Sequence, residues 1–338
     1  MSSEFQIAGL DVPVGTKKRG FLRVGPYFPH ERAHIRSYVL IPFTVIKGVK
    51  DGPILAQTAG CHPTEYAGID ATIRLSNAIK PEELKGTYIA VHCVNTPGFY
   101  ERNYVNPIDG KNMQETYPGM AYGTGGTISD LMCYEVFNKV VLRANYFLDC
   151  HGGDIHESEI WWASFYKTDD DVEKKSEAIA RSTGLTYISR ATSRPGMRSM
   201  GLEAARKGVA GALFEICEGD RLLPEESSAI FECTLNVMSH LGMLEGEPKK
   251  IKGQPATTEG QKQELWTSGA SAYFTRGGVY HTEVKPGDLL KKGQVIGTVT
   301  DFWGEVVETI HAPGTGRIGL MIHNPVVNPG DTAITVYS

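Results

Sequence analysis

The sequence predicts an α/β protein with a mixed, largely parallel sheet flanked by helices, followed by a small all-β domain. In the first two thirds of the chain, short apolar runs alternate with segments of helical periodicity. From residue 279 to residue 338, short alternating runs are separated by Pro-Gly, Lys-Gly and Asn-Pro-Gly turns. The chain has 338 residues, more than the about 250–300 that one core usually supports. We therefore expect a first domain at 1–245, a polar linker at 246–263 and a β-rich domain at 264–338.

The first elements form a strand–helix–strand unit. Residues 1–35 mix Gly, Pro and charges, so we expect irregular structure or short edge strands there. Pro42 indicates an edge position for its strand, because proline cannot donate to a central ladder. The elements expected next are strands at 38–46 and 53–58, a helix at 64–79 and a strand at 87–94.

A long segment rich in Asn, Pro, Gly and Tyr occupies residues 95–125. Loops of this length in a compact domain are usually functional or disordered, and the aromatic content argues against disorder. Strands and helices then resume. They are expected at 127–143 (helix), 145–150 (strand), 169–183 (helix), 201–207 (helix), 209–216 (strand) and 224–241 (helix).

Composition excludes several classes of protein. The net charge is -5 without a basic cluster, so we expect no nucleic-acid partner. No apolar run approaches the ~20 residues that span a bilayer, and residues 1–11 lack the pattern of a secretory signal. Six scattered cysteines without a C-x-x-C pair are typical of reduced thiols. These features predict a cytoplasmic protein with no membrane partner, while a homo-oligomer remains open.

Two residues at the end of the strand 53–58 have the chemistry of metal ligands. His62 follows the strand, and Glu65 stands three residues later at the expected helix start. Imidazole nitrogen and carboxylate oxygen are both ordinary zinc ligands. An isolated H-x-x-E is also common among unrelated surface residues, so the assignment depends on the rest of the chain.

Two further strand ends supply matching groups. His151 ends the strand 145–150, and strand ends of an α/β sheet meet at one edge. His62, Glu65 and His151 would thus form an N, O, N set. Glu215 near the end of the apolar strand 209–216 is either a general base or a core carboxylate paired with an arginine. Asp149, on the same side of its strand as His151, would orient that histidine or make a turn contact.

These segments resemble the succinylglutamate desuccinylase/aspartoacylase family, which is related to zinc carboxypeptidases. The resemblance runs from about residue 35 to the C-terminus and rests on segments in the order of the family, namely 60–65 (GCHPTE), the loop 95–119, 149–153 (DCHGG) and 214–216 (FEI). It implies a zinc carboxypeptidase-like fold and a zinc-dependent amidohydrolase of small molecules. One Zn²⁺ per chain would be held by His62, Glu65 and His151, with Glu215 as the general base.

The chain departs from the family pattern at several positions. Pro63 replaces a usual Gly, and the run 112–115 (NMQE) stands where the family has Asn-Leu-Asn-Arg, so an acid replaces the carboxylate-binding arginine. A second family arginine, for the oxyanion, falls at Tyr104, and Arg102 is an alternative. The C-terminal domain resembles biotinyl or lipoyl carriers but has no lysine at an evident carrier hairpin. The resulting substrate-binding candidates are Arg102, Tyr104, Asn112, Gln114 and Glu115.

The acid at Glu115 suggests a cationic substrate. Further acids at Asp154, Glu157 and Glu159 precede Trp161 and Trp162, and acids with aromatics suit an ammonium or guanidinium group. A solvated acidic face is the alternative.

The substrate carboxylate needs a cation in place of the missing arginine. Arg194 or Arg198 would supply that anion contact, or both are surface residues. The leading hypothesis is a deacylase that cleaves the amide bond of a small N-acylated amine or amino acid. The alternatives are a catalytically impaired metal-containing binding protein and a carboxypeptidase.

Overall fold

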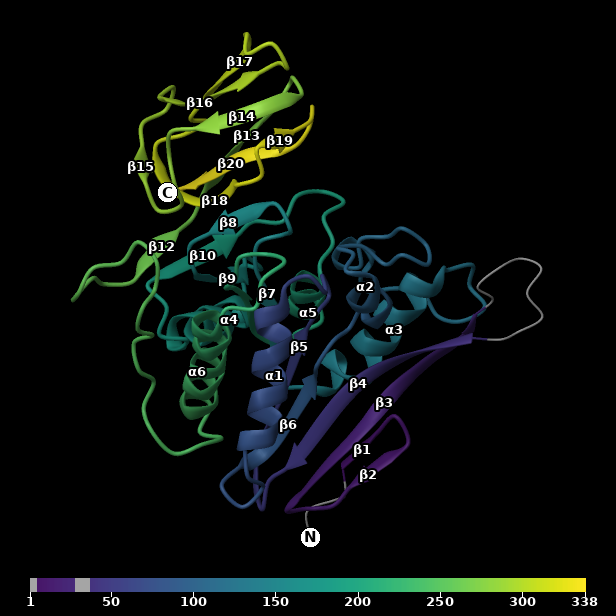
Figure 1. Cartoon of the computed structure of the whole chain (residues 1–338). Helices are drawn as coiled ribbons and strands as arrows, with labels where there is room; N and C mark the ends of the chain where they lie inside the picture. The colour runs from purple at the N-terminus through teal and green to yellow at the C-terminus, as the bar shows by residue number, and fades with distance from the viewer. Residues whose placement is uncertain (1–4, 28–36) are drawn as a thin grey trace.

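The computed structural model describes residues 5–27 and 37–338. A nine-stranded mixed sheet with helices on both faces forms the larger part, and two antiparallel sheets form a second part at one end of it (Figure 1). The expected fold class is therefore confirmed. The domain boundaries themselves stay a prediction. Residues 264–266, just beyond the expected linker, form an outermost strand of the large sheet.

The large sheet brings together strands from far-separated parts of the chain. In spatial order it contains β12 (Glu264–Trp266), β10 (Tyr187–Ala191), β9 (Trp162–Tyr166), β11 (Ala210–Glu215), β7 (Tyr146–His151), β5 (Lys50–Ala59), β6 (Lys85–Val91), β4 (Ser37–Lys47) and β3 (Thr16–Tyr27). The central strands β11, β7, β5 and β6 are mutually parallel. Antiparallel pairs join β9 to β11, β6 to β4 and β4 to β3.

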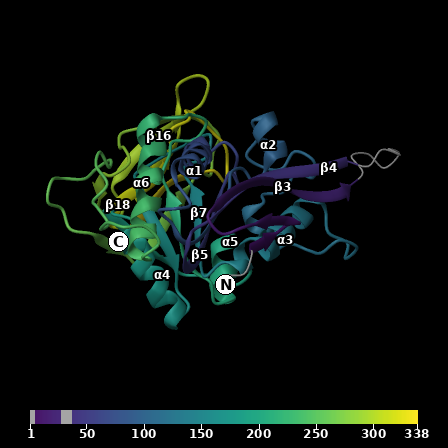
Figure 2. The same cartoon turned by 90° about the horizontal axis from the view of Figure 1, so that it is seen from below.

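Helices cover the two faces unequally, as the view from below also shows (Figure 2). One face carries α1 (Tyr66–Ala78), α4 (Asp171–Ser182) and α6 (Pro224–His240). The other carries α3 (Ile128–Lys139) and α5 (Met200–Arg206). Shorter elements are β1 (Phe5–Ile7), β2 (Leu10–Val12), α2 (Thr96–Glu101), β8 (Glu157–Glu159) and two 3-10 turns, η1 (Gln114–Thr116) and η2 (Val141–Arg143).

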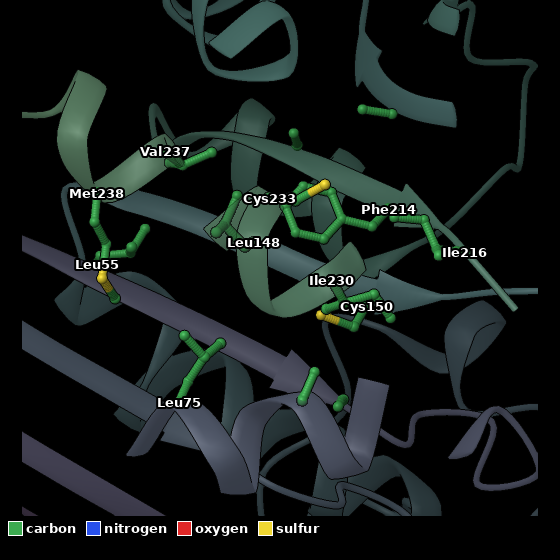
Figure 3. Close-up of a cluster of buried hydrophobic side chains, with 14 of the residues drawn as sticks. Leu55, Leu75, Leu148, Cys150, Phe214, Ile216, Ile230, Cys233, Val237 and Met238 are labelled. Carbon is green, nitrogen blue, oxygen red and sulfur yellow. The ribbon is translucent and has the colours of Figure 1, made fainter. Parts of the chain in front are cut away.

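The core beneath the first face explains why these strands and helices pair. Leu148 and Phe214 on neighbouring strands pack against Leu75 of α1 and against Ile230 and Val237 of α6, and all five are fully buried (Figure 3). Each such side chain contributes roughly 1.5–3 kcal/mol on burial. The apolar runs that predicted β7 and β11 are thus explained by burial on a parallel sheet covered by helices.

Parallel pairing also aligns the strand ends. Ala59 of β5 pairs with Cys150 of β7, and His151 at the end of β7 pairs with Glu215 at the end of β11. The carboxyl ends of these strands therefore lie at one edge of the sheet, where α/β proteins place their ligands.

Helix α1 begins at Tyr66, two residues later than predicted, with Glu65 at the N-cap. The Glu65 side chain makes no capping hydrogen bond because its carboxylate lies against two histidines. Farther along, Gly68 lets the helix approach the sheet, since a Cβ there would lie 2.8 Å from the Cβ of Cys150.

Several expectations are wrong at the sheet edges. The segment 1–35 contains a twelve-residue edge strand, β3, although residues 1–4 and 28–36 lie outside the described range. Strand β4 is consequently not at the edge. Pro42 is tolerated there because it lies just past the last pair with β6, Phe43 with Val91, where no ladder donor is needed. Strands β8, β9 and β10 had no prediction.

The second part consists of two small antiparallel sheets. One contains β13 (Gly269–Tyr273), β20 (Thr332–Tyr337), β18 (Gly316–Ile322) and β15 (Leu289–Leu290), and the other contains β17 (Val306–His311), β16 (Val295–Thr300), β14 (Gly278–Thr282) and β19 (Val326–Val327). The loop between β16 and β17 presents Phe302 and Trp303 at its tip and no lysine.

The two parts are joined by strand pairing and by aromatic packing. Strand β8 pairs with β18, and Tyr337 stacks on Trp266 at 4.9 Å between ring centroids. Trp162 packs against the same Tyr337 ring. Throughout the described residues, every helix is too short or too polar to cross a membrane.

Candidate metal centre and its cavity

His62, Glu65 and His151 converge at the edge of the sheet formed by the strand ends. The Nδ1 atom of His62 lies 2.8 Å from Oε1 of Glu65, and Nδ1 of His151 lies 3.1 Å from Oε2. All three side chains are buried. The sequence prediction that these residues meet is therefore realised in the fold, because β5 and β7 are parallel neighbours.

The distal nitrogens of both histidines have their own partners. Nε2 of His62 lies 3.0 Å from Oδ1 of Asn112, and Nε2 of His151 lies 3.2 Å from Oδ2 of Asp149. The amide nitrogen of Gln114 also lies 3.1 Å from that His151 atom. The oxygens of Asn112 and Asp149 are acceptors and suit a proton on Nε2, which leaves the lone pair of each Nδ1 directed toward Glu65. Asn112 and Gln114, expected to contact substrate, thus contact the candidate ligands.

The three residues fit a zinc ion. One donor atom from each lies within 4.8 Å of the others. Oε2 of Glu65 is buried, and its 3.1 Å contact with Nδ1 of His151 does not have the geometry of a hydrogen bond, although a buried carboxylate oxygen is costly to leave unpaired. Burial alone would raise the pKa of Glu65, but the two histidines outweigh burial and lower it. Two imidazole nitrogens and an ionised carboxylate form a set that Zn²⁺ accepts, with room for water as a fourth ligand.

Glu215 lies next to this centre, in the register position opposite His151. Its side chain lines the cavity in front of the three residues and is not paired with an arginine in any described ion pair. Burial, aided by the negative charge of Glu65, raises the pKa of Glu215 well above its ordinary value, while His151 opposes that rise. A carboxyl group with a raised pKa at the edge of a metal centre has the position of a general base.

A cavity of about 630 Å³ opens in front of the centre. Its wall consists of His62, Tyr104, Asn112, Gln114, Glu115, His151, Tyr166, Gly196, Met197, Arg198, Ser199, Leu213 and Glu215. The Tyr104 ring stacks on His62 with a centroid distance of 4.0 Å. Arg102 is not part of the wall, because it ends α2 in a left-handed conformation with its side chain exposed.

The cavity wall carries two exposed groups of opposite charge. Glu115 follows Gln114 in the turn η1, and Arg198 lies in the loop before α5. Neither has an ion-pair partner among the residues that the structure describes. Arg194, the other arginine of that loop, does not line the cavity.

The expectation about acids and tryptophans near residue 160 is wrong in part. Trp161 and Trp162 are only 5% and 3% exposed and pack in the protein core. Glu159 is likewise buried, and neither Asp154 nor Glu157 lines the cavity. Trp161 packs in the core of the large sheet, and Trp162 packs against Tyr337 of the C-terminal part, so neither ring is available to a ligand.

Sequence reasoning missed Tyr166, Ser199 and Leu213 in the cavity wall. Tyr166 ends a strand that was not predicted, and Ser199 caps a helix that begins at Met200, one residue before the expected start. The capping pattern at Ser199 was the one available signal, since Ser before a helical segment is a typical N-cap.

The fold is that of solved succinylglutamate desuccinylase/aspartoacylase proteins, which confirms the resemblance inferred from the sequence. A crystal structure of such a protein from Rhodobacter sphaeroides has a TM-score of 0.83 at 21% identity, with 98% of each chain covered. The product-bound ectoine utilization protein EutE (DoeB) from Ruegeria pomeroyi has a TM-score of 0.85 at 19% identity, covering 96% of this chain and 97% of that one.

A curated relative extends the comparison to sequence. The N-alpha-acetyl-L-2,4-diaminobutyric acid deacetylase of Halomonas elongata is 28% identical over 336 residues, covering 97% of this chain and 94% of the relative. No protein-family profile matches the chain. The named relatives are thus deacylases or proteins of the same fold.

Proposed function

We propose that this protein is a zinc-dependent deacylase that hydrolyses the amide bond of a small N-acylated amino acid with a second, free amino group. The observation that carries the proposal is the buried cluster of His62, Glu65 and His151 beside Glu215 in one cavity. The activity named for the Halomonas elongata relative supports the choice of an N-acetylated diamino acid.

The proposed reaction divides its tasks between the metal and the protein. Zinc, when bound by His62, Glu65 and His151, makes water acidic and polarises a carbonyl group. Glu215 accepts the proton of the attacking water and returns it to the leaving amine. Asn112 and Asp149 hold the two imidazoles in place. Tyr104, fixed by stacking on His62, supplies a hydroxyl on that side of the cavity.

The two charges of the cavity wall support the substrate class. Glu115 is placed to attract an ammonium group, and Arg198 is placed to attract a carboxylate. An N-acylated diamino acid carries both groups. An acidic amino acid would bring a second carboxylate toward Glu115, which repels it.

The test of catalysis is a Glu215→Gln variant assayed with N-acetyl-diaminobutyrate. We expect zinc content equal to that of the parent protein and a loss of turnover of about 10²- to 10⁴-fold, the range for a general base. A matched Glu305→Gln variant changes an exposed glutamate of the C-terminal part and serves as the control. Normal turnover by the Glu215→Gln variant would contradict the assignment. Stoichiometric zinc without hydrolysis by the parent protein would instead favour a metal-containing binding protein.

The test of the substrate class is a Glu115→Gln variant. Because a hydrogen bond to a charged group contributes about 1.5–3 kcal/mol, we expect KM for the cationic substrate to rise about tenfold or more. KM for N-acetyl-norvaline, which lacks the second amino group, should not rise. Improved turnover of the cationic substrate after Glu115→Arg would contradict the proposal that Glu115 binds the ammonium group.

A further inference from the structure

Leu213 is a cavity residue that the proposed function leaves without a task. It lies on β11 two residues before Glu215 and is only 7% exposed. Residues two apart on a strand point to the same side of the sheet. Leu213 therefore lies beside Glu215 in the cavity wall, one step deeper in the sheet, where its register partners are Asp149 and Ser164.

A second, much smaller cavity lies directly behind Leu213. Its volume is about 10 Å³, which leaves no room for more than a single water molecule. Its lining comes largely from β11 and α5 and includes the small residues Gly201, Ala205 and Gly211. Leu213 and Tyr166 line both cavities. These two residues are therefore the partition between the substrate cavity and the space behind it.

The two residues of the partition differ in how firmly they are held. The Tyr166 ring packs on the backbone of α5, where a Cβ at Gly201 would lie only 3.1 Å from Cε2. The Tyr166 hydroxyl also accepts a hydrogen bond from Ser199 at 2.7 Å. Leu213 is held by packing alone and is the aliphatic part of the partition. The length of the Leu213 side chain thus determines whether the two cavities are separate or joined.

The lining of the second cavity suits a hydrocarbon chain. Oγ of Ser164 accepts a hydrogen bond from Nε1 of Trp162 at 3.0 Å, and Oγ of Ser176 accepts one from the backbone N–H of Gly211 at 3.0 Å. Phe147 and small side chains supply much of the remaining surface. A group that entered this space from the substrate cavity would therefore have to be apolar, because a polar group would lose its water without gaining a partner.

The charges of the cavity wall indicate which part of an N-acylated diamino acid meets Leu213. Glu115 and Arg198 suit the two charged groups of the amino-acid portion. The carbonyl carbon must lie within reach of Glu215, and the amide nitrogen and the acyl chain leave that carbon in different directions. The acyl chain carries no charge, so it is the part that faces the aliphatic residue next to Glu215.

We propose that Leu213 closes the acyl subsite and restricts the acyl group to a short one such as acetyl. The inference rests on the proposed function, since it specifies which acyl group that deacylase accepts. An acetyl group places one methyl against Leu213, whereas a butyryl group is two methylenes longer and meets the partition. Removing the Leu213 side chain beyond Cβ joins the two cavities and admits the longer chain.

The test compares Nα-acetyl-2,4-diaminobutyrate with Nα-butyryl-2,4-diaminobutyrate. For the parent protein we expect kcat/KM on the butyryl substrate to be lower by about tenfold or more. Leu213→Ala should raise the ratio of butyryl to acetyl kcat/KM by about tenfold or more, because fitted apolar pockets discriminate single methylenes by that much. Leu289→Ala, which shortens an exposed leucine of the C-terminal part, is the matched control and should leave the ratio unchanged. The same ratio in Leu213→Ala as in the parent would overturn the proposal.

Two further variants separate the acyl subsite from an effect on folding. Truncation of a buried leucine destabilises a core, so the milder Leu213→Val should shift the ratio in the same direction and by less. If Leu213→Ala does not fold, an unchanged ratio in Leu213→Val counts against the proposal. In a Leu213→Ala/Ala205→Leu double variant, the added side chain refills the second cavity, so the preference for acetyl should return. Butyryl turnover that persists in the double variant would show that the acyl chain lies elsewhere.

A binding measurement reads the subsite without turnover. Acetate and butyrate are titrated calorimetrically into the zinc-loaded protein. Leu213→Ala should raise the affinity for butyrate relative to acetate by about tenfold, since two more methylenes are buried. If the parent protein hydrolyses neither acyl substrate, the proposed function fails. The two acids still decide the subsite, because a relative affinity that Leu213→Ala leaves unchanged would refute it.

Discussion

At the scale of the residue, the protonation of Glu215 links activity to stability. Its pKa lies well above the ordinary 4.5, first because of burial and then because of negative neighbours. The base is protonated and inactive at low pH, so kcat/KM should rise with pH and its acid limb should lie above pH 4.5. A pH–rate profile checks this expectation. An acid limb at or below the ordinary value would contradict it.

The same raised pKa affects the free energy of unfolding. The folded protein holds the Glu215 proton more tightly than the unfolded chain does. The contribution of Glu215 to the free energy of unfolding is therefore fully present below its pKa in the unfolded chain, and it is lost as pH rises through its pKa in the folded protein. We expect the Glu215→Gln variant, without metal, to be more stable than the parent at neutral pH and equally stable in acid. Denaturant titrations at several pH values test the sign, and a variant that is less stable at neutral pH would show that the ionised form is favoured.

At the scale of the element, the approach of α1 to the sheet supports the metal centre. Gly68 lies in the helix one turn after Glu65, and a methyl group there would crowd Cys150 at 2.8 Å, next to His151. Gly→Ala in a helix usually stabilises a protein by about 1 kcal/mol. Here we expect the opposite sign, a loss of about 1–3 kcal/mol, because overpacking moves the helix. Weaker zinc binding should accompany that loss.

Chemical denaturation and zinc titration of Gly68→Ala provide the measurement. Ile73→Ala on the exposed side of the same helix is a suitable comparison, since it does not face the sheet core. A stabilised Gly68→Ala protein with unchanged zinc affinity would show that the contact relaxes without moving Glu65.

At the scale of the whole molecule, an aromatic cluster and the pairing of β8 with β18 attach the C-terminal part. The Tyr337 ring stacks on Trp266 and also contacts Trp162, and a Cβ at Gly319 would approach the Tyr337 ring to 2.5 Å. Because the two tryptophans pack against the Tyr337 ring, it has little room to move away from an added methyl group. We expect Gly319→Ala to lower the free energy of unfolding by about 1–3 kcal/mol and to speed proteolysis in the region 246–263. Unchanged proteolysis and unchanged stability would show that the junction depends on β8–β18 pairing instead.

The candidate site was predictable where its residues belong to regular elements. His62, Glu65, His151 and Glu215 stand at strand ends that apolar runs mark in the sequence, and parallel pairing brings such ends together. Asp149 also contacts His151, as the two-residue spacing on a strand suggested. For the loop residues the prediction was coarser. Asn112 and Gln114 lie against the histidines, and Arg102 lies outside the cavity.

Sequence patterns alone were enough to predict the fold class, the candidate metal ligands and the candidate base. These features depend on local periodicity and on residue identity at strand ends. The folded chain was needed to show that Arg198 and Tyr166 share a cavity with Glu115, and that Trp162 packs against the C-terminal part. The physical reason is that loop conformation and the unpredicted strand β9 depend on contacts between segments far apart in the chain, which no local pattern records.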